Sequence, residues 1–101
     1  MFDKDKLKIG VDGIRKNKPD GKLGTFWTKG GVILIDDKTI KLNYIGTMAI
    51  FSRKNVKYYR DKDEELIFKR VLRICDDTQD FSVIMYPSAF DKFMKAMKNC
   101  N

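Results

Sequence analysis

The stretch Phe81-Ser82-Val83-Ile84-Met85-Tyr86-Pro87-Ser88 decides the fold class, because a strand pattern ends in it and a helix pattern begins. Its first six residues are rich in β-branched and aromatic side chains, which favour a strand, and Pro87 ends that strand. A helix is predicted over 88–99, with Ser88 and Asp91 spaced as in a capping box. The apolar stripe of this helix consists of Phe90, Phe93, Met94 and Met97. Such a stripe packs a helix against a sheet.

Upstream of this strand, short apolar bursts alternate with polar pairs, which is typical of an antiparallel sheet. Thr39-Ile40-Lys41-Leu42-Asn43-Tyr44 alternates as a half-buried strand requires, and Gly46 marks a bulge or bend after it. Further strands are predicted at 25–28, 32–35, 48–51 and 56–59, with the first two joined as a hairpin through Lys29-Gly30-Gly31. Residues 1–22 are polar and glycine-rich, with a turn at 18–21, and are expected to form an arm or a loosely held first strand.

The segment Asp61 to Cys75 fits two patterns. As a helix it carries acids at its start and bases later, in agreement with the helix dipole. As a strand it pairs with 56–60 and with 81–86, and Leu66, Phe68, Leu72 and Ile74 then share a face that Arg70 interrupts. The strand is the preferred interpretation, and the helix stays the alternative.

Length and composition indicate one domain. The 101 residues are 43% hydrophobic, which suffices for a single core. Two cysteines are too few for a disulfide framework, and no apolar run is long enough to span a bilayer, so we expect a cytoplasmic protein, or a nuclear one in a eukaryote. The formal charge of +7 predicts attraction to polyanions, either nucleic acid or an acidic protein surface.

The positive charge is concentrated in the first 60 residues. Residues 38–60 contain six basic side chains and no carboxylate, interleaved with aromatic rings. Lysine and arginine neutralise phosphates, and exposed rings stack on unpaired bases, so this stretch predicts a nucleic-acid-binding surface. Adjacent Tyr58 and Tyr59 cannot share a strand face, so one of them is expected to be buried. The predicted binding residues are Lys38, Lys41, Tyr44, Arg53, Lys54, Lys57, Tyr58, Tyr59 and Arg60.

Catalytic chemistry finds little support in the sequence. The chain has no histidine, so it lacks the usual general base and the usual nucleophile-activating partner. Asp20, Asp36 and Lys38 imitate the two carboxylates and the lysine of a metal-dependent nuclease, but both segments also read as ordinary turns. We therefore expect no enzyme, no cofactor and no metal, with the nuclease as a remote alternative.

The strand at 82–85, the break at Tyr86-Pro87 and the apolar helix beyond it resemble the C-terminal part of the positive-cofactor-four and whirly type of single-stranded-DNA-binding proteins. That resemblance covers about twenty residues. It implies a curved sheet followed by one helix, a homodimer, and single-stranded DNA held on the sheet.

These observations together predict an α+β domain: a curved antiparallel meander of five to seven strands with one C-terminal helix packed on it. A pleckstrin-homology-like barrel is the alternative architecture. The expected function is non-catalytic binding of single-stranded DNA or RNA through the basic and aromatic surface. The alternative function is a protein-interaction module, such as a small viral or mobile-element regulator, that docks on an acidic protein partner.

Overall fold

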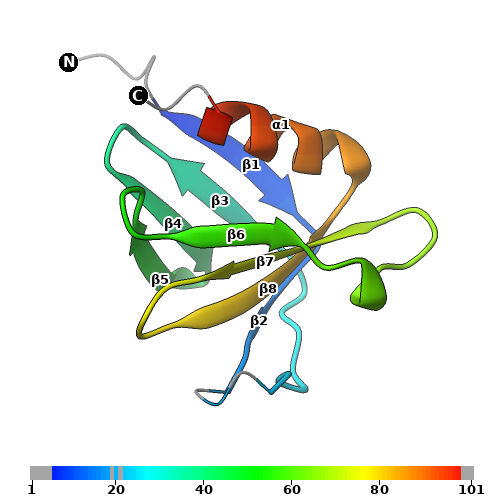
Figure 1. Ribbon diagram of the computed structural model, residues 1–101. Helices are drawn as coiled ribbons and strands as arrows, with labels where there is room; N and C mark the ends of the chain where they lie inside the picture. The colour runs from blue at the N-terminus through cyan, green and yellow to red at the C-terminus, as the bar shows by residue number, and fades with distance from the viewer. Residues whose placement is uncertain (1–5, 19, 21, 99–101) are drawn as a thin grey trace.

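The computed structural model describes residues 6–18, 20 and 22–98. Within them the chain forms two antiparallel sheets of four strands each and one long helix (Figure 1). The elements are β1 (Leu7–Val11), β2 (Gly13–Lys16), β3 (Gly31–Ile35), β4 (Thr39–Tyr44), β5 (Gly46–Ser52), β6 (Lys57–Arg60), the 3-10 helix η2 (Lys62–Glu64), β7 (Arg70–Cys75), β8 (Asp80–Met85) and α1 (Pro87–Lys98).

Strands β1 and β2 connect the two sheets. The first sheet has the order β1-β3-β4-β5 and the second the order β2-β8-β7-β6. The chain passes from one to the other at Asp12, beside a buried glycine. A Cβ atom on Gly13 would lie 2.9 Å from the carbonyl oxygen of Thr28, so only glycine fits where the chain crosses over.

Both sheets contribute their inner faces to one hydrophobic core. Ile33, Leu42, Leu72 and Val83 are fully buried, since alternate residues of each strand point inward. Phe51 of β5 meets Phe81 of β8 edge to face, with ring centroids 6.1 Å apart, and this contact joins the two sheets.

Helix α1 lies along β1 at one end of the two-sheet body (Figure 1). Its residues Phe90, Phe93 and Met97 are buried, as the predicted stripe requires. The ring of Phe93 meets Tyr58 of β6 edge to face at 5.4 Å, so the helix contacts the second sheet as well. Among the residues that the structure describes, no helix has both the length and the apolar composition that crossing a bilayer requires.

The α+β class, the antiparallel pairing and the C-terminal helix packed on a sheet are confirmed. The described strands number eight in two sheets, rather than five to seven in one meander, because residues 7–16 supply an edge strand to each sheet. The alternative of a pleckstrin-homology-like barrel shares the single C-terminal helix, but the described strands do not close into a barrel, because their pairing leaves both sheets open.

Two expectations for the first third of the chain are wrong. The expected first strand is present as β1, but residues 7–16 are not loosely held, because Ile9, Val11 and Ile14 belong to the core. The rest of the predicted arm at 1–5, and positions 19 and 21 of the predicted turn, lie outside the described residues. The predicted strand at 25–28 is reduced to a single bridge between Trp27 and Arg15, and no hairpin forms at 29–31. Gly31 instead enters β3, which pairs with β1 and β4.

The ambiguous segment 61–75 resolves into three parts. Its second half is β7, paired with β6 and β8 as the strand interpretation predicts. Its first half is η2 and a turn in which the amide of Lys69 donates to the carbonyl of Leu66 at 3.2 Å. Leu66 and Phe68 therefore do not share a face with Leu72; they are 62% and 75% exposed.

Candidate functional site

The nine predicted binding residues are divided between the two sheets and their turns, and the turns of Lys38 and Arg53 meet where the amide of Arg53 donates to the carbonyl of Lys38 at 3.0 Å. Lys38, Lys41 and Tyr44 belong to the first sheet and its β3–β4 turn, whereas residues 57–60 form the edge strand β6 of the second sheet. Arg53 and Lys54 lie in the turn between the two sheets. Lys38, Lys54 and Lys57 are exposed, as a binding role requires, while several of the others serve the fold.

Arg53 is a structural residue. Its guanidinium donates to the carbonyl of Asp36 at 2.6 Å and to the carbonyl of Ala96 near the end of α1 at 3.0 Å. These bonds fix the β5–β6 turn to the β3–β4 turn and to the helix, so the side chain is committed to contacts within the chain.

On β6, the predicted binding residues Arg60 and Tyr58 also make contacts within the chain. Arg60 makes a two-point contact with Glu65, with N–O distances of 2.7 and 2.8 Å. This contact lowers the pKa of the Glu65 carboxyl and raises that of Arg60. Tyr58 packs inward on Phe93, whereas Tyr59 is 49% exposed, so the two tyrosines lie on opposite faces as expected.

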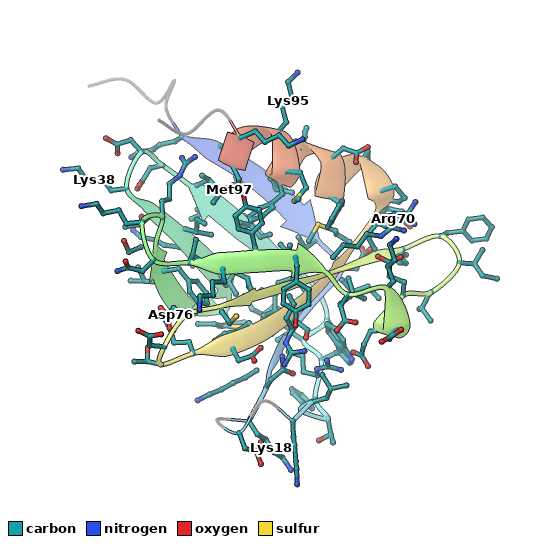
Figure 2. The ribbon with its side chains drawn as sticks, in the orientation of Figure 1. Lys18, Lys38, Arg70, Asp76, Lys95 and Met97 are labelled. Atoms are coloured by element: carbon teal, nitrogen blue, oxygen red, sulfur yellow. The ribbon has the colours of Figure 1, made fainter. Side chains whose placement is uncertain are left out.

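The nuclease pattern is not assembled. The carboxylate of Asp36 accepts hydrogen bonds from the amides of Lys38 and Thr39 at 2.9 and 2.7 Å, which makes it a turn-forming residue. Asp20 is two residues after Lys18 in the sequence. Figure 2 shows Lys18 and Lys38 far apart, at different ends of the molecule, so the two halves of the pattern are not brought together. No group of three or more metal-ligating side chains is found in the described part of the chain.

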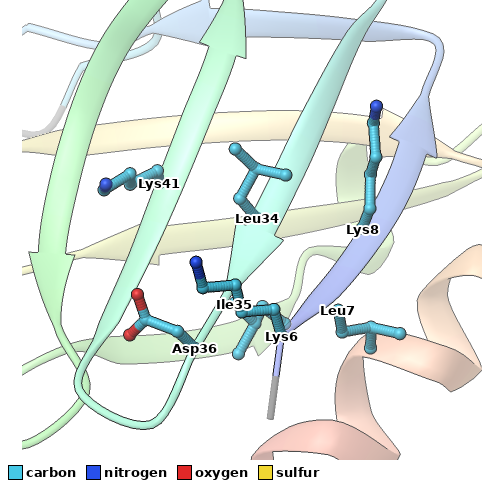
Figure 3. Close-up of a pocket in the computed structure, with 7 residues that line it drawn as sticks. All are labelled: Lys6, Leu7, Lys8, Leu34, Ile35, Asp36 and Lys41. Atoms are coloured by element: carbon cyan, nitrogen blue, oxygen red, sulfur yellow. The ribbon is translucent and has the colours of Figure 1, made fainter. Parts of the chain in front are cut away.

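A different row of side chains crosses the outer face of the first sheet. The strand register places Lys8 opposite Leu34, Leu34 opposite Lys41, and Lys41 opposite Ile50, so one residue from each of the four strands lies in line. We call these four residues the lysine row. Figure 3 shows Leu34 between Lys41 and Lys8 on adjacent strands, with all three side chains rising from the same face.

The lysine row combines free positive charge with apolar surface. Neither Lys8 nor Lys41 makes an ion pair with a described residue, and Ile50 is 52% exposed. The strands of this sheet contain no carboxylate. Lys41 lowers the pKa of Asp36 at longer range, after the larger effect of the hydrogen bond from the Lys38 amide. A shallow hollow of about 340 Å³ opens on this face, lined by Lys6, Leu7, Lys8, Leu34, Ile35, Asp36 and Lys41 (Figure 3).

The second sheet carries a corresponding row on its own outer face. The register aligns Arg15 with Ser82, Ser82 with Arg73, and Arg73 with Tyr59. We call these four residues the arginine row. In contrast to the lysines of the first sheet, its two arginines are buried: Arg15 is 4% and Arg73 9% exposed, and Arg15 stacks on Trp27 at 4.5 Å.

Hydrogen bonds and ion pairs satisfy the buried arginines. Arg15 donates to Ser82 at 3.0 Å and contacts Glu64 of η2 at 2.6 Å. Arg73 makes a two-point contact with Asp80, at 2.6 and 2.9 Å. Burial alone would raise the pKa of Asp80, but the hydrogen bonds from Arg73 and Asn17 outweigh it, and the pKa is lowered.

Sequence reasoning missed both rows, because each takes its members from strands distant in the sequence. The signal was present only in part: the alternation of 39–44 placed Lys41 on a polar face, but nothing local indicates that Lys8 and Leu34 lie beside it. In the comparisons with known proteins, no family model matches the chain and no curated protein matches it.

Proposed function

We propose that this protein is a non-catalytic interaction module whose lysine row docks an acidic, partly apolar segment of a partner protein. The observation that carries the proposal is the alternation of cation and aliphatic side chain along the row, Lys8–Leu34–Lys41–Ile50. An apolar patch with positive charges beside it is typical of a protein-binding site, whereas single-stranded nucleic acid favours stacking rings.

The spacing of the row favours a particular partner geometry. Neighbouring strands are about 4.8 Å apart, so the stems of Lys8 and Lys41 are separated by two spacings, roughly 10 Å. Seven residues of an α-helix rise about 10.5 Å. An amphipathic helix with acidic residues at i and i+7 and leucines at i+3 and i+4 would therefore place its carboxylates at the lysines and its leucines at Leu34.

Single-stranded nucleic acid is the second candidate. The first sheet has no carboxylate on its strands, and Tyr44 at the end of β4 is 41% exposed, which suits an anionic ligand with unpaired bases. It ranks second because the other exposed predicted ring, Tyr59, belongs to the second sheet.

The test is a fluorescence titration of the protein with two labelled ligands, a helical peptide of the pattern just described and a single-stranded oligothymidylate. We expect the peptide to bind at low salt and to bind more weakly as salt screens the charges. Replacing both lysines (Lys8→Glu with Lys41→Glu) should weaken peptide binding by about tenfold or more, and Leu34→Ser should weaken it without changing the salt dependence.

The matched control reverses two exposed lysines elsewhere, Lys18→Glu with Lys95→Glu, which changes the net charge equally. An equal loss of binding in this control would show that overall charge, and not the lysine row, attracts the peptide. Oligothymidylate binding that depends on Lys8 and Lys41, with no peptide binding, would replace the proposal with the second candidate.

A further inference from the structure

Three consecutive large apolar side chains stand in solvent at the end of the loop between η2 and β7. Leu66, Ile67 and Phe68 are 62%, 85% and 75% exposed. We call these three residues the apolar tip. Figure 1 shows the loop that carries them extending past the ends of β6 and β7, away from both sheets. Scattered exposed apolar residues are ordinary, but a contiguous group at a protruding turn indicates contact with something apolar.

Ion pairs hold the residues on both sides of the tip. Glu64 and Glu65, immediately before the tip, contact Arg15 and Arg60. Lys69, immediately after it, contacts Asp12 at 2.5 Å and lies 3.9 Å above the ring of Tyr86. Both ends of the turn are thus held by ion pairs to other parts of the chain.

From this geometry we infer that the apolar tip inserts into the interface of an anionic lipid bilayer. The tip is convex and only three residues wide, whereas a specific protein interface buries about 800 Å² per partner. A bilayer accepts apolar side chains without a complementary pocket. This surface is separate from the lysine row, so the inference goes beyond the proposed function.

Charge and flanking side chains agree with this occupant. The carboxylates of Asp61, Glu64 and Glu65, which precede the tip, are ion-paired to Arg73, Arg15 and Arg60. The long-range attraction to anionic lipid comes from the net charge of +7, which is concentrated in the first 60 residues. Lys62 and Arg70 lie on either side of the tip, and their stems can extend along headgroups. Tyr86, 55% exposed and in contact with Lys69, presents the kind of amphipathic ring that is enriched at membrane interfaces.

The experiment is sedimentation of the full chain with vesicles of phosphatidylcholine, alone and with about a third phosphatidylserine. We expect binding to the mixed vesicles and weaker binding to the neutral ones. The double variant Ile67→Ser with Phe68→Ser should reduce partitioning by about tenfold or more, because two apolar side chains that would enter the bilayer are lost. Its melting temperature should not change, because both side chains are exposed in the folded protein. A Phe68→Trp variant should shift its emission to the blue when vesicles are added.

The chain offers a matched control in Phe26 and Ile45, which are 79% and 86% exposed but lie on two separate loops. Phe26→Ser with Ile45→Ser should leave vesicle binding unchanged. The inference is overturned if no vesicle binding is found, if the tip variant binds as the parent does, or if the control loses as much. Concentration-dependent self-association that the tip variant abolishes, without vesicle binding, would assign the tip to a protein contact instead.

Discussion

A single guanidinium, that of Arg53, joins three separate segments of the chain. It donates to the carbonyls of Asp36 and Ala96, which lie 17 and 43 residues away in sequence. Arg53→Ala would leave these carbonyls without that donor, so we expect a loss of about 1–3 kcal/mol in the free energy of unfolding, measured by urea denaturation. Lys54→Ala, at the exposed neighbouring position, should stay within about 0.5 kcal/mol of the parent. Equal effects of the two changes would contradict the structural role of Arg53.

Carboxylates with lowered pKa values make stability depend on pH. Hydrogen bonds lower the pKa of Asp36 and Glu65, and at Asp80 they outweigh the opposing effect of burial. In the unfolded chain a carboxyl titrates near pH 4. Around and below that pH the unfolded chain therefore binds more protons than the folded chain, in which these carboxyls have lower pKa values. The stabilisation is therefore complete above about pH 5 and is lost as the pH falls through the lowered pKa values.

Asp80→Asn tests this linkage at one residue. We expect a lower melting temperature at pH 7, because Arg73 loses a charged partner, and a shallower decline of the melting temperature between about pH 5 and pH 2. Asp77→Asn, in the preceding turn and exposed, serves as the control. If the melting temperature of Asp80→Asn falls as steeply with decreasing pH as that of the parent, Asp80 does not contribute to the acid sensitivity.

At this scale the sequence allows only local predictions. The opposite faces of Tyr58 and Tyr59 follow from strand alternation alone, and the structure agrees. The commitment of Arg53 to the helix end cannot be read from the sequence, because it depends on how the turns of two sheets meet. The charge pattern of the sequence therefore does not show which basic side chains, like that of Arg53, make their contacts within the chain.

Among the elements, the loop of residues 22–28 depends on a close approach to β2. A Cβ atom on Gly24 would overlap the carbonyl oxygen of Lys16, and the amide of Gly24 donates to the Asn17 side chain at 3.1 Å. Gly24→Ala should therefore displace the loop, destabilise the protein by about 1–3 kcal/mol and change the fluorescence of Trp27, which this loop places on Arg15. Gly10→Ala is the matched control, since a Cβ there meets nothing within 4 Å. Similar fluorescence in both variants would contradict the close approach.

Helices and strands with a clear hydrophobic periodicity could be predicted from the sequence, whereas the loops between them could not. The C-terminal helix and the strand at 39–44 follow from periodicity, and both are present. The alternation at 66–74 suggested a longer strand, but the chain turns before β7 begins, beside the ion pairs of Glu64 with Arg15 and of Glu65 with Arg60. The pair of Glu64 with Arg15 joins residues 49 positions apart, which no local pattern encodes, whereas Glu65 and Arg60 are only five positions apart.

For the whole molecule, the two sheets share one core but differ on their outer faces. On the second sheet, Glu64 of η2 and Trp27 contact the buried Arg15, and Asp80 pairs with the buried Arg73. The first sheet leaves its lysine row open, with two lysines that make no ion pair to a described residue. This difference makes the first sheet the binding surface in our proposal, and it follows from strand register that only the fold establishes.

The most direct test of that proposal is a charge exchange. The variant Lys8→Glu with Lys41→Glu should lose affinity for the helical peptide with glutamates at i and i+7, and should gain affinity for the same peptide with lysines there. Binding of both peptides to both proteins is measured by titration at one salt concentration. We expect the parent to bind the acidic peptide about tenfold or more tightly than the basic one, and the variant to bind the basic peptide about tenfold or more tightly than the acidic one. An unchanged preference for the acidic peptide in the variant would contradict the proposal.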